Sequence, residues 1–154
     1  MKKVTPFSIL ILLSVVFILS QCKKEEDWSY CNCGIESWVG TYQGSGDYYE
    51  DDQPDSKQVE VDMIIEQFSS DNLTVKIDVT DEYSETFYAE KDDSTYYITV
   101  NSNYKSLTMN LKKKGMDYKL IGTAKNFHTE TDDDGNTYTV FDKVISFDVT
   151  RAGH

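Results

Sequence analysis

The strongest constraint on this chain is the alternation of apolar and polar residues after residue 57. Apolar residues recur at every second position in three runs, which are Val59–Ile65, Leu73–Val79 and Leu107–Leu111. Successive side chains of a β-strand point to opposite faces of a sheet, so this spacing predicts strands with one buried and one solvated face. Helical spacing is not found after residue 21, and the predicted fold class is therefore all-β.

Turn-forming residues divide this pattern into strands. Asp, Asn, Ser and Gly gather at 69–72, 80–82, 91–94 and 132–136, and they tolerate the tight backbone of hairpins. The breaks predict eight strands at 38–46, 57–68, 72–80, 83–91, 94–101, 105–112, 117–127 and 138–150. The apolar parity changes between Val140 and Phe141, which predicts a bulge near Asp142. Eight short strands with short links indicate a single antiparallel up-and-down barrel, because closure removes exposed edges.

The first 21 residues have the pattern of an export signal. Lys2 and Lys3 precede an apolar stretch at 7–19. A membrane-spanning helix needs about 20 apolar residues, whereas the core of a signal peptide needs only about 7–15. We therefore expect a cleaved signal peptide at 1–21. An ordinary signal with a chance cysteine and an uncleaved anchor helix are the alternatives.

The residues around the expected cleavage site carry a family resemblance. Leu19-Ser20-Gln21-Cys22 resembles the lipobox of bacterial lipoproteins, which implies acylation of Cys22 and anchoring of the mature chain in the lipid bilayer. Lys23-Lys24-Glu25-Glu26-Asp27 resembles the surface-export signal of Bacteroidota-type lipoproteins. This resemblance implies that the mature protein is anchored in the outer membrane and faces the cell exterior. A periplasmic location is the alternative, with this run as a solvated tether.

Charge and cysteines narrow the functional classes. The formal net charge of −12 argues against nucleic acid, and it also disfavours adhesion to anionic lipid. Two explanations of the acidity remain, which are binding of a cationic partner and solubility through self-repulsion. Cys31 and Cys33 lie in the predicted tether, residues 22–36, without enough further ligands for a metal site. We expect a structural or incidental pair, no metal and no cofactor.

The start and end of the predicted domain, residues 37–154, carry a second resemblance. The segment Trp38-Val39-Gly40-Thr41-Tyr42 resembles the strand that opens the barrel in lipocalins and in calycin-like bacterial lipoproteins. In that family, a basic residue on the last strand packs across the opening aromatic. Arg151 is the one arginine of the chain and stands at the end of the last predicted strand. The resemblance implies a calycin-like barrel in which Trp38, Gly40, Tyr42 and Arg151 have a structural role in closure.

An eight-stranded barrel either fills its interior with side chains or holds one small ligand. The first hypothesis is a binding module for a small apolar or amphipathic ligand, because tyrosines can line such a pocket. The alternative is a protein-contact module, an inhibitor or an accessory subunit, with a filled barrel and functional loops. No catalytic set is recognisable, so we do not expect an enzyme. The acidic run 130–136 is better explained by a hairpin turn than by a calcium loop. The candidate ligand residues are Tyr48, Tyr49, Tyr88, Tyr96 and Tyr118, of which the first two fall in a predicted loop at 44–57.

Overall fold

The computed structural model describes residues 27–50, 55–92 and 95–153, so the predicted signal peptide and Cys22 lie outside the described residues. Within them the chain is all-β, with one short 3-10 turn, η1 (Ile35–Ser37). Nine described strands form one antiparallel sheet. They are β1 (Ser29–Tyr30), β2 (Gly40–Glu50), β3 (Lys57–Gln67), β4 (Asn72–Val79), β5 (Tyr83–Glu90), β6 (Tyr97–Asn101), β7 (Lys105–Lys114), β8 (Asp117–Thr131) and β9 (Thr137–Arg151).

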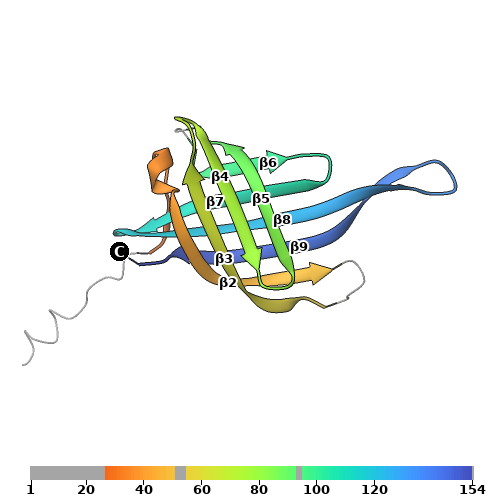
Figure 1. Ribbon diagram of the computed structural model, residues 1–154, viewed down its shortest axis with the longest axis horizontal. Coiled ribbons are helices and arrows are strands. Elements are labelled where there is room, and N and C mark those ends of the chain that lie inside the picture. Colours follow the sequence, from red (N-terminus) through yellow and green to blue (C-terminus); the bar gives the residue numbers. More distant parts are fainter. Residues whose placement is uncertain (1–26, 51–54, 93–94, 154) are drawn as a thin grey trace, which may run out of the picture.

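Neighbouring strands follow the chain order from β2 to β5 and from β6 to β9, and β9 pairs with β2. The order is β7-β8-β9-β2-β3-β4-β5, and both β1 and β6 pair with the remaining edge of β7 (Figure 1). β6 covers that edge at 106–110, and β1 continues it at 112–113. Each of the eight predicted strands overlaps one of β2 to β9. β1 is an additional strand that joins residues of the expected tether to the sheet. It was not predicted, because a strand of two residues has no recognisable periodicity.

The inner face of the curled sheet is filled by apolar side chains. The three alternating runs supply much of this core, as expected: every second residue from Val61 to Ile65, from Leu73 to Val79 and from Leu107 to Leu111 is buried. Large aromatic groups from β2, from β5 and from the residue after η1 add to this core. Trp38, Tyr42, Tyr48 and Phe87 each have 2 % or less of their surface exposed.

The predicted barrel required a closed sheet, but the observed sheet is open. Within the described residues no hydrogen-bonded ladder joins β5 to β6. Side chains bridge this opening instead. Lys105 Nζ, at the start of β7, donates 2.8 Å hydrogen bonds to Glu85 Oε2 and to the Thr86 carbonyl oxygen on β5. β6 has only five residues, too short to carry a complete ladder along β5.

Two local features of the strands bear on the predictions. The register between β8 and β9 shifts between Asn126 and Phe127, so that Asp142 is the extra residue, and the predicted bulge is confirmed. The predicted loop at 44–57 is wrong for residues 44–50, because β2 continues to Glu50. Its glycines suggested a loop, but a Cβ at Gly44 or Gly46 would collide with the backbone of β9.

Candidate functional site

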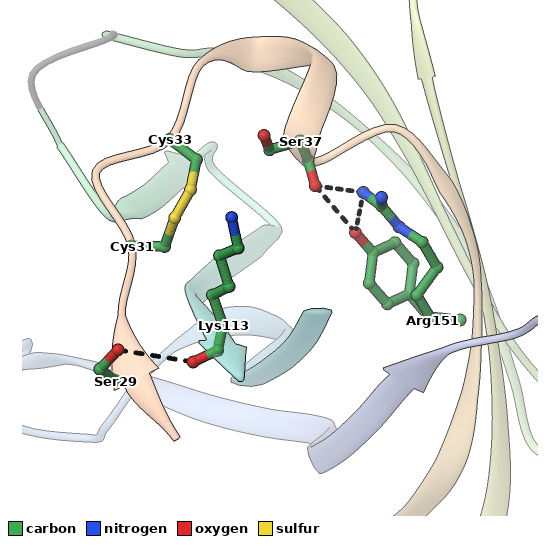
Figure 2. Close-up of a disulfide and its surroundings, with 7 residues drawn as sticks. Ser29, Cys31, Cys33, Ser37, Lys113 and Arg151 are labelled. Carbon is green, nitrogen blue, oxygen red and sulfur yellow. Dashed lines mark hydrogen bonds between the residues drawn. A yellow bond between two sulfur atoms is a disulfide. The ribbon is translucent and has the colours of Figure 1, made fainter. Parts of the chain in front are cut away.

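Arg151 lies between two aromatic rings at the end of the curled sheet where β2 begins and β9 ends. Its guanidinium carbon is 4.4 Å from the centre of the Tyr118 ring and 5.4 Å from that of Tyr42. Nη2 donates to Tyr42 Oη at 3.0 Å and to the Ser37 carbonyl oxygen (Figure 2). Tyr42 Oη in turn donates to the Trp38 carbonyl oxygen at 2.9 Å. Burial raises the pKa of Tyr42, although Arg151 opposes the shift.

The other two residues of the opening segment belong to the same cluster. Trp38 is fully buried, and Lys91 Nζ lies 5.8 Å from the centre of its ring. Gly40 has a φ of +150°, which favours glycine, and a Cβ there would lie 3.1 Å from Arg151 Nε. The structure therefore brings Trp38, Gly40, Tyr42 and Arg151 together. Lys91 was missed, because no spacing relates it to either end of the domain.

The five tyrosines predicted to bind a ligand do not line one cavity. Tyr48 is a buried core residue of β2, and its hydroxyl donates to Glu50 Oε1 at 2.6 Å. Tyr88 is exposed and packs edge-on against Phe68. Tyr49 and Tyr96 are also exposed, and Tyr118 belongs to the Arg151 cluster.

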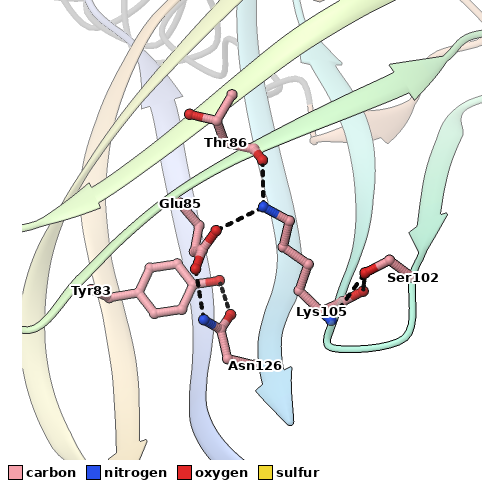
Figure 3. Close-up of polar contacts among 6 residues, drawn as sticks. All are labelled: Tyr83, Glu85, Thr86, Ser102, Lys105 and Asn126. Carbon is pink, nitrogen blue, oxygen red and sulfur yellow. Dashed lines mark hydrogen bonds and ion pairs between the residues drawn. The ribbon is translucent and has the colours of Figure 1, made fainter. Parts of the chain in front are cut away.

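A polar network spans the opening between β5 and the strands β7 and β8 (Figure 3). Asn126 Nδ2 donates to Glu85 Oε1 at 2.7 Å, and Tyr83 Oη donates to Asn126 Oδ1 at 3.2 Å. Burial alone would raise the pKa of Glu85, but hydrogen bonds from Lys105 and Asn126 outweigh burial and hold it below its ordinary value. Burial raises the pKa of Tyr83, so it stays a neutral donor. Sequence reasoning missed this network, because its members are far apart in the chain.

The hairpin of β8 and β9 extends beyond the rest of the sheet. The ladder to β7 ends at Asn126 and the ladder to β2 ends at Lys143. In residues 127–142 the two strands pair with each other, and among the described strands they have no further ladder partner. We call residues 127–142 the β8–β9 arm; Figure 1 shows it projecting at one end of the molecule. At its tip, Asp132 Oδ1 accepts the backbone N–H groups of Asp134 and Asn136, so the acidic run forms the predicted hairpin turn.

The two faces of the β8–β9 arm differ in chemistry. On one face His128 lies between two carboxylates, 2.6 Å from Asp142 and 3.1 Å from Glu130. These hydrogen bonds raise the pKa of His128. The opposite face carries an edge-to-face pair of Phe127 and Phe141. Phe141 is 44 % exposed.

Cys31 and Cys33 form a disulfide beside β7 (Figure 2). Cys31 N donates to the Leu111 carbonyl oxygen at 3.0 Å, and both cysteines pack against the core. The pair therefore lies within the fold, where it holds the segment between β1 and η1. No group of three His, Cys, Asp or Glu side chains in the described ranges has the arrangement of a metal site.

The outer face of the sheet has a shallow, open groove of about 480 Å³ across β7, β8, β9 and β2. Small polar side chains line it, among them Ser45, Thr108, Thr123 and Ser146. None of the predicted ligand tyrosines contributes to this groove.

In the part of the chain that the structure describes, no helix has the length and apolar character that crossing a bilayer requires. Comparisons with protein-family models, with curated proteins and with solved structures find no match to the chain.

Proposed function

We propose that this chain is an exported lipoprotein whose β-domain holds a protein partner on the β8–β9 arm. The acyl chains on Cys22 anchor it in the outer membrane, facing the cell exterior. The domain is an accessory subunit or inhibitor and not a carrier. The observation that carries the proposal is the arm, which projects beyond a filled sheet. Its outer strand edges, on β8 after Asn126 and on β9 before Lys143, have no neighbouring described strand.

The packed interior supports the contact module over the small-ligand carrier. The interior is occupied by large side chains, including Trp38 after η1 and Tyr48 on β2, whereas a carrier would need to keep this space clear. The curled sheet is a calycin-type barrel that remains open between β5 and β6. The cluster of Arg151 with Tyr42 supports that assignment, because it matches the expected closing contact.

The arm has the properties of a contact surface for an extended, basic segment. Strand edges without neighbours pair readily with a strand from another chain. The described residues of the arm include five acids and no lysine or arginine. Exposed Phe141 and Tyr138 add the aromatic groups that are enriched in protein interfaces. The acids favour a cationic partner over a second copy of this acidic chain.

Site-specific photocrosslinking in the native host tests the contact. A photoreactive phenylalanine analogue at Tyr138 or Phe141 should give one discrete protein adduct. The same analogue at Tyr88, which is exposed on β5, serves as the matched control. Equal adducts at all three positions, or none on the arm, would contradict the proposal. A small molecule retained in native mass spectrometry of the host protein would favour the carrier.

The anchor has a separate test. Cys22→Ser should abolish acyl labelling and release the protein from the membrane fraction. A variant that keeps its acyl label and stays in that fraction would show that the lipoprotein assignment is wrong.

A further inference from the structure

Lysines and aromatic side chains gather at the end of the domain where the described chain begins. We call this surface the anchor-side face. Its members come from the segment before β1, from β1 and the residue before β6, and from the hairpin of β7 and β8: Trp28, Tyr30, Tyr96, Lys112, Lys113, Lys114, Met116 and Lys119. Figure 1 places the β7–β8 turn at the end of the molecule opposite the tip of the β8–β9 arm.

Tyr30 and Tyr96 are exposed and Trp28 is half-buried, and neighbouring side chains hold all three rings in place. The Tyr30 and Tyr96 rings lie 4.7 Å apart, and Lys112 Nζ is 4.8 Å from the centre of the Tyr30 ring. Lys119 Nζ lies 5.1 Å from the centre of the Trp28 ring. Met116 is 79 % exposed at the β7–β8 turn. Such a mixture of tyrosine, tryptophan and lysine is typical of groups that sit at the headgroup level of a bilayer.

The charges of the domain are segregated along its length. Residues 112–119, around the β7–β8 turn, contain four lysines and a single acid, Asp117, in a chain of net charge −12. Residues 127–142 carry acids but no lysine or arginine. Two more acids lie near the anchor-side face: Asp27 precedes Trp28, and Asp148 pairs with Lys119 at 2.9 Å. The net charge therefore hides a basic end and an acidic end.

We propose that the anchor-side face rests on an anionic phospholipid surface and sets the orientation of the domain. The proposal builds on the lipid anchor at Cys22. Six residues lead from Cys22 to Trp28, and a fully extended chain spans about 3.3–3.6 Å per residue. The anchor therefore holds Trp28 within about 22 Å of the acylated residue.

The charge of the anchor-side face determines its contact with the bilayer, and the net charge of the whole chain does not. Charges are screened beyond about 8 Å at physiological ionic strength, so the acids of the distant arm contribute little at the bilayer. Lysines close to an anionic leaflet bind it favourably. The expectation that overall acidity disfavours anionic lipid does not apply to this end. With this face down, the β8–β9 arm points away from the membrane, toward a partner.

Trp28 provides an intrinsic probe for the test. The chain has two tryptophans, and the other one, Trp38, is fully buried. The full chain is reconstituted into phosphatidylcholine vesicles with or without phosphatidylglycerol, both carrying brominated lipid as a fluorescence quencher. Trp28 emission should be quenched in the anionic vesicles only, and 1 M salt should reverse the effect, since the screening length falls to about 3 Å. Trp28→Phe gives the contribution of Trp38.

Matched lysine variants test the role of charge. Each lysine near an anionic surface contributes about fivefold, so replacing Lys112, Lys113 and Lys114 by Gln should lower the ratio of face-down to free domain about 100-fold. Replacing Lys57, Lys76 and Lys143 by Gln removes the same charge elsewhere and should leave quenching unchanged. Equal quenching in neutral and anionic vesicles, insensitivity to salt, or equal effects of both triple variants would overturn the proposal. Flotation of the vesicles reports the anchor independently.

Discussion

Replacing Arg151 by alanine is the sharpest test of how the two ends of the domain are joined. The guanidinium donates to two oxygens, the Ser37 carbonyl and Tyr42 Oη, and contacts two rings. Hydrogen bonds to a charged group contribute about 1.5–3 kcal/mol, and each cation–π contact about 0.5–1 kcal/mol when partly exposed. Tyr42 Oη keeps the Trp38 carbonyl as a partner. We therefore expect Arg151→Ala to lower the free energy of unfolding by about 2–4 kcal/mol.

Urea unfolding followed by circular dichroism measures this loss. With a slope of about 2 kcal/mol/M, the midpoint should fall by about 1–2 M. Arg151→Lys keeps the charge but loses the planar donor and the stacking surface, so its midpoint should lie between those of the parent protein and of Arg151→Ala. Lys76→Ala, at an exposed position on β4, is the control. An Arg151→Ala midpoint equal to that of Lys76→Ala would refute the reasoning.

Three further predictions concern the arm, the opening and the sheet. His128 should titrate above its ordinary pKa of about 6.5 in an NMR titration, and Glu130→Gln should move it back. The folded-state pKa is raised, so the stabilisation is present at low pH and is lost as the pH rises through that pKa. The pKa of Glu85 is lowered, so its pairing with Lys105 stabilises the fold above about pH 4.3 and is lost as the pH falls through the folded-state pKa. Glu85→Gln should therefore flatten the acid limb of the stability curve. Gly122→Ala should cost about 1–3 kcal/mol in urea unfolding, because the new methyl group meets the backbone of β7.

Each of these has an outcome that would contradict it. A His128 pKa that Glu130→Gln does not change would mean that the pairing on the arm does not persist in solution. If Glu85→Gln leaves the acid side of the stability curve unchanged, the polar network between β5, β7 and β8 does not stabilise the fold. A Gly122→Ala protein as stable as the parent would mean that β7 and β8 can separate locally without cost.

The core and the ends of the domain could be predicted from the sequence, because their signals are periodic or rare. Leu73–Val79 alternates without interruption, and it forms β4 with every second side chain buried. The parity change after Val140 located the bulge at Asp142. The resemblance of the opening segment to lipocalins implied a basic residue across Tyr42, the one arginine of the chain matched it, and the two are in contact.

The rest depends on contacts that leave no local pattern. Gly44 and Gly46 suggested a loop, but their lack of a side chain lets β9 approach β2. The open edge between β5 and β6 depends on how far the sheet curls, which no single strand encodes. Tyr118 was expected near a ligand and instead stacks on Arg151. Tyr30 and Lys112 are far apart in the sequence, and only the pairing of β1 with β7 brings the lysine over the ring.

The place of β9 in the sheet affects the order in which the chain can fold. β9 follows the other described strands in the chain, yet it lies between β8 and β2, and its pairing joins Arg151 to Tyr42. During synthesis the β2–β5 half and the β6–β8 half therefore share no hydrogen-bonded ladder until β9 has been made. Pairing over such a separation is slow. A chain with this topology therefore completes its core only after β9 has been made and has paired with both β8 and β2.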